Sequence, residues 1–534
     1  MTINRRDFLK AGAVAASLAA LPRPLIAATR STPIQAPTIT DPDVRELAMR
    51  ALDAAKSAGA TYGDVRLTHG FNRQFGAHYF NDWETMEVGV RALVQGYWGF
   101  ASGPVWTPDE MARLGREAYH QAKTNALGKN RVVELAPTPV VANGHWVSPV
   151  EIDPLQLSPY EIMDYLASLD IYTPRVDPGA TVGANSCTFT WQEKAFASTE
   201  GSYCTQRLCT GKGDLTIILE DKKLGRKDDR GIDLLTVSSN GWELYRGQPL
   251  REAIRRLIEE MKEDMKLPVK PVDVGRYDTV VDAWSVTKLL SETIGRATEL
   301  DRALGYEANA GGTSYLNDPF GMVGTYQVGA PALHVTAERS APGGAATVKW
   351  DDEGVEPDAF TLVKDGVLAD FQTTRESAGW MKDAYTKAGR PVRSHGCAVA
   401  DSAIDAPLQQ PPNLTMRPGH EGLDFDAMVS GLESGIAARY MKADMDFQQL
   451  NGLGTGLFYE VKKGKRVAII NQAGILFRAP ELWKGIRALG GSGSARRFGS
   501  YTSKGEPAQV AAHSVTAVPA VFKQLTLIDP QRKA

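Results

Sequence analysis

The chain has little cysteine, almost no excess of charge and no long apolar run beyond its first residues, and each absence excludes a class of function. The four cysteines among 534 residues, Cys187, Cys204, Cys209 and Cys397, show no zinc-finger spacing. In an oxidising compartment Cys204 and Cys209 could pair across a short loop, and free buried thiols fit equally well. A net charge of −3 gives no reason to expect nucleic acid or an anionic membrane as a partner. We therefore expect no nucleic acid and no membrane span.

What is present at the N-terminus is the pattern of an export signal. Asn4–Lys10 reads Asn-Arg-Arg-Asp-Phe-Leu-Lys, a twin-arginine motif, and a modest apolar region covers Ala11–Leu21. Ala27-Ala28 is a plausible small-residue cleavage site. The apolar region is too short to cross a bilayer. We therefore predict a signal peptide over residues 1–28, followed by a spacer over 29–42, and a periplasmic location reached by the twin-arginine pathway.

The first half of the remaining chain predicts alternating helices and strands. An amphipathic helix is expected over 44–57 and a strand over 87–94. Thr107-Pro108-Asp109-Glu110 combines an N-cap threonine, a proline at the first helical position and a glutamate, which predicts the start of a second helix. Further strands are expected at 214–220 and 234–238, and a charged helix at 251–266.

The second half reads as mostly β. Two prolines near 268–271 suggest a boundary that divides the chain into domains 43–268 and 269–534. Strands are expected at 345–350 and 526–529, and a helix at 425–439. Two hairpins are also expected, over 360–371 with an Asp365-Gly366 turn and over 457–470.

The segment Lys288–Asp301 has the periodicity of a core helix. Apolar residues recur on one side at Val286, Leu290, Ile294, Ala297 and Leu304. The opposite side carries Glu292, Arg296 and Glu299, with an acid four residues before an arginine, the favourable order for a helical ion pair. The pattern predicts a buried helix with a solvated charged face.

The same segment resembles the signature helix of the TldD/PmbA family. The resemblance covers Leu289–Ala308 and Gly312-Thr313-Ser314, and it extends to the "DDEG" of 351–354 and the "KGEPAQ" of 504–509. A run from Gly89 to Ala101 also resembles the family's N-terminal domain. The resemblance implies an α+β fold, with an N-terminal α/β domain and a β-rich C-terminal domain that carries the signature helix. It also implies a peptidase scaffold that encloses extended or unfolded peptides.

The residues at the family's zinc site depart from its pattern. Peptidase members carry His-Glu-x-x-x-His on this helix and a cysteine in a later segment, and all three ligands hold zinc. Here Glu292 matches the glutamate, whereas Ser291, Arg296 and Thr502 occupy the ligand positions. A neutral hydroxyl is a poor zinc ligand, and a guanidinium stays protonated. We therefore expect no zinc cofactor, and we hypothesise that Arg296 supplies beside Glu292 the positive charge that the metal would provide.

The resemblance implies a non-catalytic, peptide-binding subunit of a periplasmic peptidase complex. In the family, zinc-bearing TldD-like subunits pair with TldE/PmbA-like subunits that lack the ligands, so the expected partner is a zinc-bearing paralogue or a second copy of this chain. Two alternatives stay open. One is an active metal-dependent peptidase with an atypical site that uses Glu292 and either His395 and Cys397 or ligands from a partner. The other is a non-enzymatic periplasmic binding or assembly factor.

Other candidate groups have simpler interpretations. Lys288 precedes Ser291 by three residues, but no oxyanion-hole sequence accompanies this Ser–Lys pair, so a nucleophilic serine is not favoured. His334 and His513 are isolated in the sequence and are expected to be structural. The glycine-rich stretch 490–497 lacks the Gly-Lys-Ser/Thr ending of a phosphate-binding loop.

Overall fold

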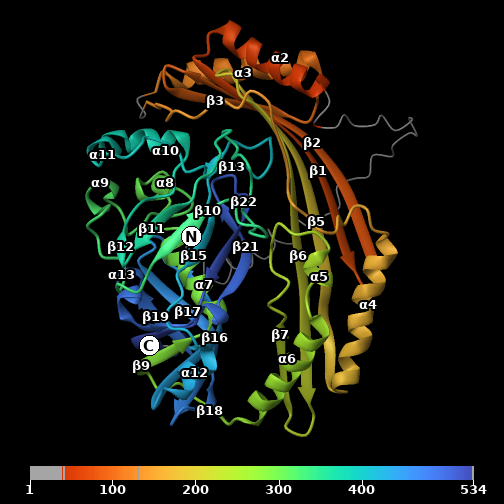
Figure 1. The fold of residues 1–534 in the computed structure, drawn as a ribbon, viewed down its shortest axis with the longest axis vertical. Helices are drawn as coiled ribbons and strands as arrows, with labels where there is room; N and C mark the ends of the chain where they lie inside the picture. The colour runs from red at the N-terminus through yellow and green to blue at the C-terminus, as the bar shows by residue number, and fades with distance from the viewer. Residues whose placement is uncertain (1–38, 40–41, 129–131, 532–534) are drawn as a thin grey trace, which may run out of the picture. The chain divides into compact units, whose positions relative to one another are not determined.

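The computed structural model describes residue 39 and residues 42–128 and 132–531, and these have a mixed α+β architecture (Figure 1). The predicted signal segment 1–28 and nearly all of the predicted spacer lie outside the described residues. Residues 39–534 group into one compact unit. No helix in the described part of the chain combines the length and apolar character needed to cross a membrane.

The first half of this unit is built on a seven-stranded sheet. Its order is β3 (Tyr97–Gly103), β2 (Tyr79–Val94), β1 (Tyr62–Gly76), β5 (Ala180–Ser198), β6 (Tyr203–Asp221) and β4 (Gly144–Val147), and β7 (Arg226–Gly231) pairs with β6. The sheet is antiparallel except for the short strand β4, which pairs parallel with β6. Two groups of helices bury apolar side chains against it. Helices α2 (Pro42–Ala58) and α3 (Pro108–Asn125) pack on β1–β3, whereas α4 (Pro159–Val176), α5 (Glu243–Arg246) and α6 (Leu250–Lys266) pack on β5 and β6.

The second half contains two large sheets, of six and eight strands, and a two-stranded sheet of β13 (Ala398–Val399) and β14 (Leu408–Gln409). The six-stranded order is β12 (Val367–Leu368), β11 (Phe360–Lys364), β10 (Val335–Glu338), β15 (Asn413–Met416), β22 (Gln509–Ala517) and β21 (Arg496–Lys504). The eight-stranded order is β16 (Ser434–Met445), β9 (Gly275–Val281), β23 (Ala520–Ile528), β19 (Gly474–Arg478), β17 (Asn451–Lys462), β18 (Lys465–Ile470) and β8 (Val269–Lys270), and β20 (Ile486–Leu489) pairs with β23. An additional β16–β17 pairing closes five of these strands into a ring.

Short helices complete the second half and connect its sheets. They are α7 (Ala283–Leu290), the π-helical turn η1 (Ser291–Gly295), α8 (Leu300–Ala303), α9 (Pro319–Met322), α10 (Arg375–Trp380), α11 (Lys382–Lys387), α12 (Phe425–Ser430) and α13 (Ala479–Leu482). The core of this half gathers apolar side chains from α7, η1, both large sheets and α13. The predicted boundary at 268–271 follows α6 and contains β8, the first strand of the eight-stranded sheet along the chain, and it remains a prediction.

Local turn and cap signals were reliable guides to these elements. The turn between β11 and β12 places Asp365 and Gly366 at φ 49° and 85°, as an Asp-Gly hairpin turn requires. Lys463 and Gly464 do the same between β17 and β18, at φ 52° and 72°. The Thr107 side chain caps α3 by accepting a hydrogen bond from the Glu110 amide.

Three of the predicted elements are wrong. Residues 234–238 form only an isolated bridge, at Ser238, and residues 345–350 contain turns instead of a strand. The helix predicted over 425–439 ends at Ser430, and β16 begins at Ser434. In each case contacts far along the chain decide the backbone, and a short apolar pattern carries no information about them.

All four cysteines are buried and free. Cys204 and Cys209 both lie on β6, where residues five apart point to opposite faces of the sheet. The strand therefore keeps the two thiols apart, and the pairing considered across a short loop does not form.

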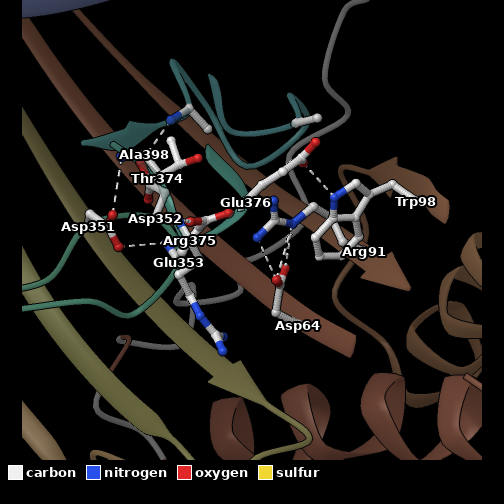
Figure 2. A network of polar contacts seen from close by, with 12 residues as sticks. Asp64, Arg91, Trp98, Asp351, Asp352, Glu353, Thr374, Arg375, Glu376 and Ala398 are labelled. Carbon is white, nitrogen blue, oxygen red and sulfur yellow. Dashed lines mark hydrogen bonds and ion pairs between the residues drawn. The ribbon is translucent and has the colours of Figure 1, made fainter. Parts of the chain in front are cut away.

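The "DDEG" segment joins the first sheet to the second half through buried charges (Figure 2). Arg91 on β2 binds Asp64 on β1 (Nη2–Oδ2 2.6 Å) and reaches Glu353 (Nη1–Oε1 3.2 Å). Lys194 on β5 pairs with Asp352 (Nζ–Oδ1 2.7 Å). Because all of these groups are nearly inaccessible to water, removal of one partner would leave a buried charge uncompensated, at a cost of about 3–5 kcal/mol.

The turn that presents these carboxylates is stabilised by hydrogen bonds from its own backbone amides to the Asp351 side chain. Asp351 Oδ1 accepts hydrogen bonds from the amides of Glu353 and Val355, both at 2.9 Å. Gly354 adopts φ +71°, and a Cβ at that position would lie 2.3 Å from Cε1 of Phe196 on β5. A side chain is therefore excluded both by the backbone conformation and by the adjoining sheet.

We predict that Gly354→Ala destabilises the protein more than Gly225→Ala, a matched control. Gly225 also has a positive φ, +63°, but nothing lies within 4 Å of its added Cβ. The control should lose about 1 kcal/mol in free energy of unfolding from backbone strain alone, and Gly354→Ala about 3 kcal/mol, because overpacking against Phe196 is added. Urea denaturation of both variants measures the free energy of unfolding. Equal losses in the two variants would contradict the close packing of Gly354 against Phe196.

Candidate functional site

The signature segment does not form one continuous helix. Asp282 caps α7 by accepting a hydrogen bond from the Ser285 amide (2.8 Å). After Leu290 the helix widens into the π-helical turn η1, in which the Arg296 amide donates to Ser291 O, five residues back (3.0 Å). The chain then turns and restarts as α8. Such single π turns occur frequently at functional sites, and an apolar periodicity does not indicate them.

Glu292 and Arg296 form an ion pair on this turn. Glu292 Oε2 lies 3.0 Å from Arg296 Nε, and each side chain is 23% exposed. Burial raises the pKa of the Glu292 carboxyl, and Arg296 is the strongest influence in the opposite direction. The sequence predicts that Arg296, four residues after Glu292, lies beside it, and this ion pair agrees with that prediction.

Glu299, the other acid of the predicted solvated face, is buried. Glu299 accepts from Lys504 Nζ at 3.0 Å and from Arg302 Nε at 3.0 Å. Lys504 also contacts both carboxylate oxygens of Asp301 at 2.8 Å. Although burial works against it, the Asp301 and Glu299 carboxylates raise the pKa of Lys504. The prediction of a water-exposed charged face is therefore wrong beyond Arg296, because β21 covers it.

Ser291 contacts a histidine that sequence reasoning had set aside. His513 Nε2 lies 3.3 Å from Ser291 Oγ and 3.3 Å from Ser500 Oγ. His513 is fully buried, and burial, together with nearby Lys288 and Arg296, lowers its pKa to about 4. The ring is thus neutral at physiological pH. His513 is isolated in the sequence but not in the fold, and its expected structural role remains a prediction. The signal that could have located its surroundings is its pairing with Ser500 across the β21–β22 hairpin.

Thr502 lies on the same face of β21 as Ser500 and Lys504, because side chains two apart share a face. Ser500 contacts His513, which contacts Ser291 at the start of η1. Lys504 contacts Glu299, which follows the end of η1. Thr502 is therefore held between these two attachments, beside η1. Its hydroxyl donates to Ala511 O (3.4 Å), and no contact with Ser291 or Arg296 is recorded among the described residues.

These groups do not provide the donors that zinc requires. Zinc sites in proteins use three or four histidine, cysteine or carboxylate ligands. Here the hydroxyls of Ser291 and Thr502 are hydrogen-bonded, Arg296 is a cation and His513 supplies a single imidazole. In the described part of the chain, no group of three or more His, Cys, Asp or Glu side chains could hold a metal ion.

The alternative pair His395 and Cys397 is not arranged as a metal site either. His395 Nδ1 is 2.8 Å from Asp358 Oδ1 and Nε2 is 3.0 Å from Asp370 Oδ2, so both ring nitrogens are engaged. The Cys397 side chain is fully buried, and burial raises its pKa to about 12, which keeps the thiol protonated.

A cavity of about 890 Å³ opens beside α7. Trp284 at the start of α7, Lys442 on β16 and the Gly499–Tyr501 segment of β21 line one side, and residues of β6 and β7 line the other. Lys288 Nζ lies 5.2 Å from the Trp284 ring centroid, and burial lowers the pKa of this lysine. The edge strand β21 therefore has the cavity along it, close to the turn that carries Ser291 and Glu292.

Comparison with family models and curated proteins finds related chains. Residues 274–518 match the PmbA/TldA metallopeptidase C-terminal domain, and residues 2–22 match the twin-arginine translocation pathway signal sequence. A metalloprotease of Methanocaldococcus jannaschii is 21% identical over 396 residues, which cover 73% of this chain and 79% of that protein. A metalloprotease of Methanothermobacter thermautotrophicus is 26% identical over 202 residues, covering 38% of this chain and 39% of that one.

Solved structures share the fold over nearly the whole chain. A Thermotoga maritima protein described as a modulator of DNA gyrase aligns with a TM-score of 0.67 at 16% identity, covering 91% of this chain and 100% of that one. TldE from Thermococcus kodakarensis aligns with a TM-score of 0.66 at 13% identity, covering 91% of this chain and 99% of that one. At these identities the likeness establishes the fold.

We predict that His513 makes stability depend on pH. The unfolded histidine takes up a proton as pH falls below 6.5, whereas the folded one stays neutral down to about 4. Stability should therefore fall across this interval, by roughly 3 kcal/mol for this group. His513→Gln keeps a hydrogen-bonding side chain but does not titrate, so it should flatten the pH dependence of the free energy of unfolding. His78→Gln, at an exposed position, is the control, and an unchanged slope in His513→Gln would contradict the assignment.

Proposed function

Because the chain belongs to the TldD/PmbA family, we propose that it is a metal-free member which binds extended peptides as the non-catalytic subunit of a periplasmic peptidase complex. In this proposal a zinc-bearing paralogue performs hydrolysis, and this chain helps to enclose the peptide. The loss of zinc and the role as a subunit belong to one hypothesis. A chain without metal ligands could take part in peptide cleavage only together with a partner that has them.

The observation that carries the proposal is the ion pair between Glu292 and Arg296 at 3.0 Å. A carboxylate that would activate a metal-bound water is here compensated by a guanidinium on the same turn. The neighbouring ligand positions, Ser291 and Thr502, hold hydroxyls that are already hydrogen-bonded. The scaffold keeps its charge balance this way, and the residues that would bind the metal are replaced.

The cavity beside α7 supports the binding of extended peptides. β21 is the edge strand of its sheet, and its Gly499–Tyr501 segment borders the cavity of about 890 Å³. An edge strand offers backbone N–H and C=O groups that recognise a peptide main chain without demanding a particular sequence. At Gly499 the amide already donates to Thr236 Oγ1 (3.2 Å), so the groups offered to a peptide lie beyond that residue. Trp284 and Lys442 beside it supply apolar and cationic contacts.

The expected compartment and partner follow from the signal and the fold. The match to a twin-arginine signal over residues 2–22 supports export, and we place the mature chain in the periplasm. The structural likeness to TldE supports assembly with a TldD-like paralogue, and a second copy of this chain is the other expected partner.

The second candidate is an active metal-dependent peptidase with an atypical site, and similarity to the Methanocaldococcus jannaschii metalloprotease favours it. Within this chain its ligand set would require His395 and Cys397. The two carboxylates that engage His395 and the buried, protonated Cys397 speak against those two residues, which leaves ligands from a partner.

The experiment is a paired assay of the purified protein, alone and with a zinc-bearing paralogue from the same organism. We expect the chain alone to bind an unstructured, fluorescently labelled peptide, to carry no stoichiometric zinc and to leave the peptide intact. The pair should cleave the peptide in a chelator-sensitive manner, because only the paralogue provides metal ligands.

Arg296→His and the triple variant Ser291→His/Arg296→His/Thr502→Cys are the matched controls. The single variant should still lack stoichiometric zinc, since one imidazole does not make a site, whereas the triple variant should bind it. Zinc in the unmodified chain or in Arg296→His, or peptide cleavage by the chain alone, would overturn the proposal. Capture of one folded partner without peptide binding would favour an assembly factor.

A further inference from the structure

A second, polar cavity of about 340 Å³ lies between the first sheet and the second half of the chain. We call it the Arg339 cavity, and its lining includes Thr68, Lys194, Gln206, Arg339, Thr347 and Asp401. Its walls come from β1, β2, β5 and β6 on one side and from residues 339–352, 399–402 and the β21–β22 hairpin on the other. The cavity is separate from the Ser291–His513 contact, because Tyr501 and Ala512 line it whereas Ser500 and His513 do not.

Arg339 is a buried cation without an anion. The Arg339 residue is only 4% exposed. Within the described residues its Nε donates to Ala346 O at 3.2 Å, its Nη1 has no hydrogen-bond partner, and no carboxylate lies within ion-pair distance. Among the described residues Arg66 on β1 also lacks a paired carboxylate, and its Nε and Nη1 have no hydrogen-bond partner, but Arg66 does not line this cavity. Two further buried arginines are paired. Arg302 pairs with Glu299 and Arg375 pairs with Glu200.

Cys397 and the aspartates of the "DDEG" segment do not supply the missing charge. Burial keeps the Cys397 thiol protonated, with a pKa of about 12. Asp351 uses its oxygens to accept from the amides of Glu353, Val355 and Ala398, and Asp352 is paired with Lys194. A buried guanidinium left uncompensated is costly, so its retention here indicates a ligand with a negative charge.

Two other acidic residues that line the cavity limit which negatively charged ligands it could bind. Glu87 and Asp401 line the part of the cavity formed by β2 and residues 399–402, and burial raises the pKa of each carboxyl. They would repel a dianion such as phosphate but accept hydrogen bonds from an amide or ammonium group. This arrangement suits a ligand with one carboxylate at one end and N–H donors along its length.

We propose that Arg339 binds the C-terminal carboxylate of a peptide whose preceding residues lie along the β21 edge, an inference that rests on the proposed peptide-binding function. Tyr501 on β21, which is 47% exposed, lines both the Arg339 cavity and the larger cavity beside α7. A volume of about 340 Å³ accommodates the end of a chain, and the contact with Tyr501 gives the rest of the peptide a continuous path. The same carboxylate chemistry could come from a small organic acid, and the test separates the two sources.

The test compares one unstructured peptide in two forms, with a free C-terminal acid and with a C-terminal amide, by calorimetric titration of the purified protein. We expect the free acid to bind at least about tenfold more tightly, because it alone forms a charge-assisted hydrogen bond with Arg339. Acetate should compete weakly and inorganic phosphate should not compete. Arg339→Gln should abolish the difference between the two peptides, Arg339→Lys should keep part of it, and Arg256→Gln, at an exposed position on α6, should leave it unchanged.

A second measurement separates a binding role from a structural one. Since no carboxylate in the described part of the chain pairs with Arg339, Arg339→Gln should leave the melting temperature of the ligand-free protein unchanged or raise it. Arg375→Gln, which breaks a pair with Glu200, should lower it. Equal affinity for acid and amide overturns this inference while the proposed function stands. Competition by phosphate, or acetate binding with no preference between the peptides, overturns it as well. No binding of either peptide overturns both the inference and the proposed function.

Discussion

A carboxylate taken out of water must have positive charge or hydrogen-bond donors close to it, and this requirement organises the protein around α7. Glu292 has Arg296, and Glu299 and Asp301 share Lys504. The same requirement is met between the first sheet and the second half, where Asp64 and Glu353 share Arg91. Two of these contacts, Lys504–Glu299 and Arg91–Glu353, join residues 205 and 262 positions apart, so the arrangement of the sheets depends on where each buried charge finds its partner.

The nature of the compensating group decides what the scaffold can do. A divalent metal beside Glu292 would balance its charge and also activate water, whereas a guanidinium balances the charge but holds no water for attack. The surroundings of Ser291 are also occupied by protein groups. The neutral imidazole of His513 lies between the hydroxyls of Ser291 and Ser500 and fills this space with hydrogen bonds. Under the proposed function, the chain would thus keep the family's fold and a surface for peptides, and it would depend on another subunit for hydrolysis.

Sequence reasoning was most successful where structure is set locally. The Asp365-Gly366 turn needs positive φ at two successive positions, and few residue pairs other than Asp-Gly adopt it readily, so the hairpin was predictable. Thr107 and Pro108 marked the start of α3 for similar reasons. The resemblance of the signature segment to a known family also identified Glu292 and Arg296 before their contact was seen.

Features set by distant contacts were not predictable in this way. Nothing near Glu299 in the sequence indicates that Lys504, 205 residues later, would bury it. The π turn at Ser291–Gly295 leaves the apolar periodicity unchanged, so the helix appeared continuous. His513 seemed isolated because its partner Ser291 lies 222 residues away. In each case the missing information was the pairing of β21 and β22 against α7, which a single sequence does not reveal.

The most direct test of the central claim is a double-mutant cycle on Glu292 and Arg296, using Glu292→Gln, Arg296→Met and the double variant, with the free energy of unfolding as the measured quantity. If Arg296 compensates Glu292, Arg296→Met should be the more damaging single change, the double variant should recover part of that loss, and the coupling energy should be about 1–2 kcal/mol for a pair that is partly exposed. Additive losses would show that the guanidinium does not stand in for a missing charge, and the account would fail.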